Sequence, residues 1–304
     1  MTSTPAAAVI VGVDGSEGSL RAVDWAAEEA RLRGAPLRVV HAFIWPLLGV
    51  PLGPAPMAPP EAGLRNEAQR ILESAADRAR RAAPGVTVST DLPARVPAAA
   101  LIEASHGADL VVVGSRGLGG FSGLLLGSVG AQVTAHAACP VVVVRGGDHR
   151  RSPGPVPGEV LVGVDGSESS RLAVGFAFAY ASRRGLGVAA VHAGRPGRPG
   201  GPGVTRPGAG DADLAEAEAR LLTEALAGWR ERYPDVPVRS AVVAGRPAEV
   251  LVRQASGADL LVVGARGRGG FADLLLGSVS QAALYHAPVP VAVVRPGTAP
   301  AGSR

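Results

Sequence analysis

The stretch GADLVVVGSRGLGGFSGLLLGSV, residues 107–129, joins an apolar run to a glycine-rich segment and then to a helical pattern. The short run DLVVVG is typical of a strand that is buried on both faces, as in a parallel sheet. Gly114 and Gly117 stand where the chain leaves this strand, and glycine adopts backbone conformations that other residues avoid. Two interpretations follow: a tight turn between strand and helix, or a loop whose backbone N–H groups bind an anion.

The same pattern returns as GADLLVVGARGRGGFADLLLGSV from Gly257. The N-terminal VIVGVDGSEGS from Val9 has a counterpart in VLVGVDGSESS from Val160, and CPVVVVR has one in VPVAVVR. The glycines recur while neighbours such as Leu118 and Arg268 differ, which favours a constraint on the backbone and hence the anion-binding interpretation. We therefore predict two similar domains, residues 1–146 and 159–304, joined by a linker at 147–158.

Within each copy, short apolar runs alternate with helical patterns. AVIVGV predicts a strand and SLRAVDWAAEEARLRG, residues 19–34, a helix that Ser16 or Ser19 caps and Gly34 ends. LLLGSVGAQVTAHA, residues 124–137, predicts a later helix. This alternation favours an α/β fold in which a doubly wound, Rossmann-like parallel sheet carries helices on both faces. In such sheets ligands bind beyond the carboxyl ends of the strands.

Composition limits the function classes. The 304 residues are 47% hydrophobic and 18% charged, and all 30 of the basic Lys and Arg residues are arginine. Without lysine, a P-loop and Schiff-base chemistry are excluded. Few aromatics and no arginine block argue against nucleic acid as a partner. The sequence shows no membrane-length apolar run and no signal peptide, so we expect a cytoplasmic protein that does not enter a membrane.

Few side chains in the sequence suggest catalysis. Asp14 and Asp165 follow the first strand of each copy, where they could cap the next turn or contact a ligand. His41 and His192 recur without partners at metal-ligand spacing, so we interpret them as packing or surface residues and expect no metal site. The single Cys139 excludes an intrachain disulfide. No nucleophile elbow and no catalytic base for attack on a phosphate are recognisable, so we predict no catalytic residue.

The glycine spacing resembles a known motif. Gly114-x-x-Gly117, then nine residues, then Gly127-Ser128, repeated as Gly264-x-x-Gly267, nine residues and Gly277-Ser278, is similar to the ATP-binding motif of the universal stress protein family. The VGVDGS openings and the VVHA and AVHA second strands fit as well. The resemblance covers nearly the whole chain and implies tandem five-stranded sheets in the order 3-2-1-4-5, with one adenine nucleotide per domain.

The family pattern implies which residues contact ATP. In the first copy these are Gly12, Val13, Asp14, Ala42, Val113, Gly114, Ser115, Arg116, Gly117, Leu118, Gly119, Gly120, Gly127, Ser128 and Val129. In the second copy they are Gly163, Val164, Asp165, Ala193, Val263, Gly264, Ala265, Arg266, Gly267, Arg268, Gly269, Gly270, Gly277, Ser278 and Val279. Arg95 stands where the second copy has Gly245, so we expect a differently shaped loop there.

The resemblance implies a nucleotide-dependent regulator in a stress response or a signalling pathway, with ATP, alone or with Mg²⁺, as its ligand. One alternative is a slow ATPase or autophosphorylating enzyme that uses the same sites, with at most weak hydrolysis. A second alternative is an oligomerising scaffold without nucleotide. The resemblance further implies an intrachain pseudo-dimer of the two domains, and it allows a homodimer of chains. No motif identifies a protein partner.

Overall fold

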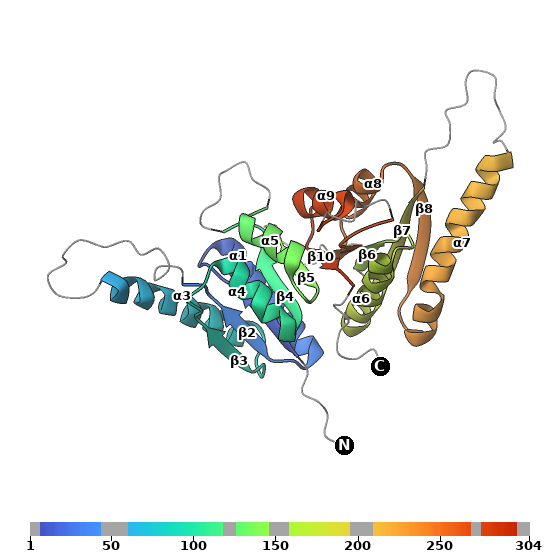
Figure 1. Ribbon diagram of the computed structural model, residues 1–304. Helices are drawn as coiled ribbons and strands as arrows, with labels where there is room; N and C mark the ends of the chain where they lie inside the picture. The colour runs from blue at the N-terminus through green and yellow to red at the C-terminus, as the bar shows by residue number, and fades with distance from the viewer. Residues whose placement is uncertain are drawn as a thin grey trace. The chain divides into compact units, whose positions relative to one another are not determined.

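The computed structural model (Figure 1) describes residues 7–43, 60–117, 126–145, 158–194, 209–268 and 275–296. These residues form two compact units, one within 7–145 and one within 158–296. Each unit is described by itself below, the first as unit 1 and the second as unit 2.

Strands and helices alternate along unit 1. Its elements are β1 (Ala8–Gly12), α1 (Glu17–Arg33), β2 (Leu37–Val40), α3 (Pro60–Ala82), β3 (Val88–Asp91), α4 (Pro97–Ala104), the 3-10 turn η1 (Ser105–Gly107), β4 (Ala108–Gly114), α5 (Ser128–His136) and β5 (Val141–Val144). The strands pair in parallel in the order β3-β2-β1-β4-β5, which confirms the predicted topology.

Helices cover both faces of this sheet. Helices α1 and α3 pack together on one face, and α4 and α5 pack together on the other. Ser16 caps α1, because its side chain accepts the N–H of Ser19, and Gly34 ends the helix in the left-handed conformation, as predicted. The central strands are buried on both faces because helices lie above and below them.

Unit 2 repeats this plan. Its elements are β6 (Glu159–Gly163), α6 (Glu168–Arg184), β7 (Gly187–Gly194), α7 (Ala209–Arg232), β8 (Val238–Ala244), α8 (Pro247–Gln254), β9 (Leu260–Gly264), α9 (Ser278–His286) and β10 (Val291–Val294). Its strand order is β8-β7-β6-β9-β10, again parallel. Helices α6 and α7 cover one face of the sheet and α8 and α9 the other.

The two units differ at the outer strand and the loop that follows it. Strand β3 ends at Asp91, and Pro93, which has no N–H to donate to a ladder, follows two residues later. Strand β8 continues to Ala244, and Gly245 then turns with φ 145°, in a region that favours glycine. Arg95 is not in that region, so the loop before α4 has a different shape, as expected.

Helix α5 begins later than the sequence suggested. The prediction of helix across Leu126 and Gly127 is wrong, because Gly127 is extended, with φ −73° and ψ 156°. Its N–H donates to the carbonyl of Ser115 at 2.8 Å, a bond between distant parts of the chain. The helix therefore starts at Ser128, and this bond ties its start to the residue that follows β4.

One charged residue lies in the core of unit 1. The Glu29 side chain has no exposed area, and its carboxylate accepts a hydrogen bond from Arg33 Nε at 2.6 Å. The equivalent position in unit 2 holds Tyr180, whose hydroxyl donates to Asp259 at 2.7 Å. In both units, a polar group buried on the equivalent helix, α1 or α6, thus has a hydrogen-bond partner, as buried polar groups require. No helix within the described ranges is long and apolar enough to cross a membrane.

Candidate nucleotide site

A cavity of about 450 Å³ opens at the carboxyl edge of the sheet in unit 1. Its walls come from the ends of β1, β2 and β4 and from the starts of α4 and α5. This is where ligands bind in doubly wound sheets, because the strand order reverses between β1 and β4. The lining residues are Gly12, Val13, Asp14, Ser19, Val40, His41, Ala42, Pro97, Leu101, Val113, Gly114, Arg116, Gly117, Gly127, Ser128, Val129 and Gly130.

Asp14 closes one side of this cavity. Its Oδ1 accepts the backbone N–H of Ser16 at 3.0 Å, so the carboxylate holds the turn that starts α1. Its Oδ2 lies against Gly117, so close that a Cβ on Gly117 would overlap it. Asp14 therefore supports a turn, one of the two roles considered from sequence, and it faces the cavity, where contact with a ligand stays a prediction.

Close packing of backbone explains the first glycine of the motif. A Cβ on Gly114 would lie 2.7 Å from the carbonyl carbon and oxygen of Gly18 in α1. Ser16 Oγ donates to the carbonyl of Arg116 at 3.3 Å. These contacts hold the end of β4 and the first residues of the glycine-rich loop against the start of α1.

The N-terminus of α5 faces the cavity. Ser128, Val129 and Gly130 line it, and no side chain caps this helix. The first N–H groups of a helix have no partner within the helix, and the helix dipole makes this end partly positive. An anion in the cavity would therefore meet several unpaired donors in one place.

Two arginines add positive charge at the end of the cavity near the start of α5. Arg116 lines the cavity, and Arg145 follows β5 beside the loop, where the Ser115 N–H donates to the carbonyl of Val144. Burial and the nearby charge of Arg116 lower the pKa of the Arg145 guanidinium. A bound anion would offset this repulsion.

His41 forms part of the cavity wall, so its interpretation as a mere packing residue is incomplete. Its Nδ1 lies 2.7 Å from the carbonyl oxygen of Val13 and must donate, because a carbonyl only accepts. In the neutral ring, Nε2 is then an acceptor. His192 repeats the contact with Val164 at 2.6 Å.

Unit 2 keeps this framework with local changes. Asp165 accepts the N–H of Ser167 at 2.9 Å and that of Arg268 at 3.0 Å. Gly277 donates to the carbonyl of Ala265 at 2.8 Å, and no side chain caps α9. The remaining described residues of the second set lie at the corresponding strand ends and at the start of α9: Gly163, Val164, Ala193, Val263, Gly264, Arg266, Gly267, Ser278 and Val279.

Unit 2 also exchanges two small residues. Where unit 1 has Ser115 and Gly130, unit 2 has Ala265 and Ser280. The Ser280 hydroxyl shares its proton between the carbonyls of Ala265 and Gly277, at 3.0 and 2.9 Å. This side chain ties the loop to the helix at a place where unit 1 has only the backbone bond.

Most of the residues predicted in unit 1 lie together around the cavity. Ser115 is the exception, because it is buried behind the loop. Five predicted positions, Leu118, Gly119, Gly120, Gly269 and Gly270, lie outside the described residues. Sequence reasoning missed Pro97, Leu101 and Gly130, which carry no motif of their own, and Ser19 and Val40. No group of three metal-ligating side chains occurs among the residues that the structure describes.

Comparisons with known proteins agree on one family. The model of the universal stress protein family matches residues 7–145 and again 158–295. A universal stress protein of Mycobacterium tuberculosis is 42% identical over 299 residues, covering 94% of this chain and 96% of the relative.

One solved structure gives the same assignment of fold. A universal stress protein from Archaeoglobus fulgidus has a TM-score of 0.70 at 21% identity, covering 95% of this chain and 98% of that one. A second universal stress protein from that organism, solved in complex with dAMP, covers 47% of this chain and 98% of its own, with 28% identity and a TM-score of 0.36. On the two family matches and the mycobacterial relative, the chain belongs to the universal stress protein family.

Proposed function

We propose that this chain binds ATP, one molecule in each unit, and that occupancy of these sites makes it a nucleotide-dependent regulator in a stress response. The observation that carries the proposal is the cavity of unit 1, which combines unpaired helix N–H groups, a glycine loop and an apolar wall. Its volume, about 450 Å³, is within the range of small-molecule sites, roughly 300–1,000 Å³.

The walls of the cavity suit the three parts of a nucleotide. The phosphates would meet the N–H groups at the start of α5 and the positive charge of Arg116. The adenine ring would pack against Val40, Leu101 and Val113, and the backbone at Ala42 could read its edge. The Asp14 carboxylate would accept hydroxyl groups of the ribose.

A metal ion would have to arrive on the phosphates. Asp14 is the only carboxylate among the described residues that line the cavity, and its Oδ1 already supports the turn at Ser16. Mg²⁺ commonly binds through substrate phosphates with only one or two carboxylates from the protein. The same scarcity of acids leaves few candidates for a general base, so the proposal is a binding protein with weak hydrolysis at most.

Titration of the full chain with ATP tests this proposal. We expect two molecules bound per chain, with Asp14→Asn and Asp165→Asn each weakening one site and the double variant weakening both. The asparagine retains one acceptor oxygen for the turn but loses the charge and the second acceptor. Asp77→Asn, on the exposed face of α3, is the matched control and should leave both sites intact.

Two results would overturn the proposal: wild-type protein that binds no ATP, as expected of a scaffold, or a double variant with unchanged affinity. Phosphate release measured on the same samples separates regulator from enzyme. Turnover that disappears in the double variant would establish the slow ATPase. The intrachain pseudo-dimer and the homodimer stay predictions, and the mass of the chain in solution tests the homodimer.

A further inference from the structure

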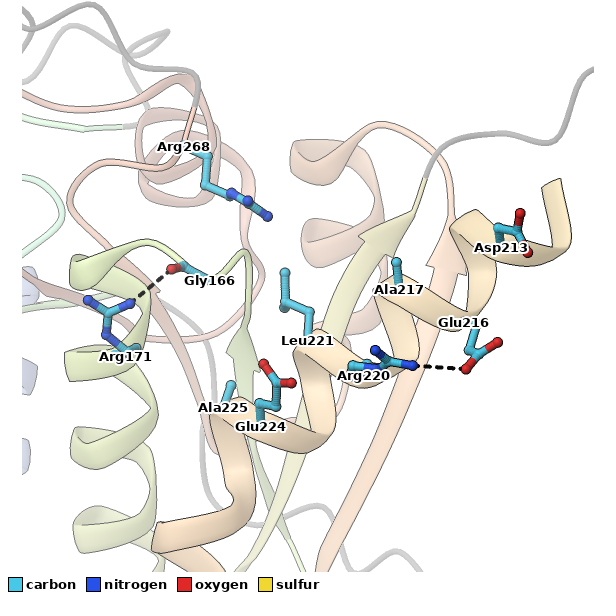
Figure 2. Close-up of a pocket in the computed structure, with 10 residues that line it drawn as sticks. All are labelled: Gly166, Arg171, Asp213, Glu216, Ala217, Arg220, Leu221, Glu224, Ala225 and Arg268. Carbon is cyan, nitrogen blue, oxygen red and sulfur yellow. Dashed lines mark hydrogen bonds and ion pairs between the residues drawn. The ribbon is translucent and has the colours of Figure 1, made fainter. Parts of the chain in front are cut away.

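A second cavity, of about 490 Å³, lies on the other face of the carboxyl edge in unit 2. Figure 2 shows it as a groove between helix α7 and the turn that precedes α6. One wall is a single face of α7, and the other is formed by Gly166, Arg171 and Arg268. Ala217, Leu221 and Ala225 give the groove an apolar strip along α7.

The two walls carry opposite charge. On the turn side, Arg171 donates one Nη1 bond to the carbonyl of Gly166 at 3.2 Å, and Arg268 extends toward α7. On the α7 side, Arg220 and Glu216 form an ion pair at 3.0 Å and neutralise each other. The charge that remains on this wall is the negative charge of Glu224 and Asp213. Glu224 and the Arg268 guanidinium make no hydrogen bond or ion pair with any residue in the described part of the chain.

The internal repeat shows that the fold does not require these charges. Gly15 faces Ile71 in unit 1 as Gly166 faces Leu221 in unit 2, so the two units can be aligned through these contacts. At the aligned positions unit 1 has Leu20 in place of Arg171 and Ser74 in place of Glu224. The opposed charges are thus an addition peculiar to unit 2.

We propose that this groove is a binding site for a small zwitterion of dipeptide size. Its carboxylate would lie between Arg171 and Arg268, its ammonium group would meet Glu224, and its apolar part would rest on Leu221. The lining as a whole is neutral, with three arginines against Asp213, Glu216 and Glu224, so it favours a ligand that carries both charges over an ion of one sign.

The site shares only Arg268 with the residues expected to contact ATP, and it does not depend on the proposed function. It lies on the α6 and α7 face of the sheet, whereas the cavity of unit 1 lies on the face of α4 and α5. Arg268 takes part on both sides of unit 2. Its backbone N–H donates to Asp165, and its side chain lines the groove.

Three forms of one dipeptide separate the two charges. Glycyl-leucine carries both, N-acetyl-glycyl-leucine only the carboxylate, and glycyl-leucinamide only the ammonium. Binding to the full chain is followed by the methyl NMR signals of Leu221, with Ile71 as the internal control from unit 1. We expect a saturable shift at Leu221 alone, and a Kd for the zwitterion about tenfold below that of either analogue, equivalent to ~1.4 kcal/mol.

Two substitutions copy residues that unit 1 already has. Glu224→Ser should reduce the affinity for glycyl-leucine to that of its acetylated form, and Arg171→Leu should reduce it to that of the amide. Neither residue belongs to the nucleotide site, so ATP binding should not change. No saturable shift, equal Kd values for the three forms, or wild-type affinity in both variants would each overturn the proposal.

Discussion

The carboxylate of Asp14 fills the space that a side chain on Gly117 would need, and Asp165 stands in the same relation to Gly267, where an added Cβ would lie 2.5 Å from Oδ2. Gly117→Ala and Gly267→Ala should therefore displace the carboxylate at one site each. We expect ATP affinity at that site to fall about tenfold or more, equivalent to ~1.4 kcal/mol. Calorimetric titration should show the loss.

Gly63→Ala is the control for this pair. Gly63 lies in α3 with open space where its side chain would be, so alanine should leave ATP binding unchanged. Helix propensity predicts a gain of roughly 0.5–1 kcal/mol in the free energy of unfolding. Normal nucleotide affinity in both loop variants would contradict the role given to the aspartates.

Charge at the loop should distinguish long from short nucleotides. Arg116→Gln removes a guanidinium from the phosphate end, so it should weaken ATP more than AMP. The difference should be roughly 1 kcal/mol, or about fivefold in Kd, because an exposed charge is largely screened by water. Competition with a fluorescent nucleotide measures both values.

Arg95→Gln is a matched surface variant, since Arg95 pairs with Glu103 at 3.1 Å on α4, away from the loop. It should change neither affinity. Higher salt should reduce the difference in Kd between ATP and AMP in the wild type, because it screens the charge of the guanidinium. Unchanged affinity for both nucleotides in Arg116→Gln would assign this side chain to solvent, and equal losses would assign it to the part of the ligand that ATP and AMP share.

The first glycine of the motif should matter for stability. Gly114→Ala would push β4 away from the backbone of α1, a segment that cannot move aside as a flexible side chain can. Overpacking of this kind costs about 1–3 kcal/mol in the free energy of unfolding. Gly107→Ala, with open space around it, should cost far less, and urea denaturation compares the two.

Glu29 and its neighbour Glu28 should differ strongly in their contribution to the free energy of unfolding. Glu29→Ala removes a fully buried carboxylate from the Arg33 guanidinium, and the Arg33 side chain is itself only 9% exposed. Breaking a buried pair costs about 3–5 kcal/mol. Glu28→Ala removes an exposed pair with Arg31 and should cost about 0–1 kcal/mol. Similar melting temperatures for the two variants would show that Glu29 is not held as described.

Much of the fold could be predicted because its signals are local. The apolar strands and caps such as Ser16 and Gly34 each follow from a few neighbouring residues, and the repeat follows from comparing the two halves of the sequence. The start of α5 could not, since LLLGSV continues a helical pattern, whereas Gly127 is extended and bonds to Ser115, a contact that the sequence does not reveal. Tertiary contacts decided that boundary.

The site divides in the same way. Glycine spacing revealed the loop because backbone geometry restricts which residues can stand there. Pro97 and Leu101 reach the cavity from α4, and nothing in their own segment of sequence indicates it. His41 was assigned to packing because only the three-dimensional structure shows that its ring lines the cavity while it holds Val13.

The uncapped start of α5 also limits which changes can disable the site. Donors that belong to the main chain survive almost every amino-acid replacement, so an alanine scan across Ser128 and Val129 would miss them. Exchanging one amide for an ester at Val129 removes a single N–H and keeps the side chain. A gene that drifts at these positions would therefore change side chains while keeping the backbone donors that we propose bind phosphate.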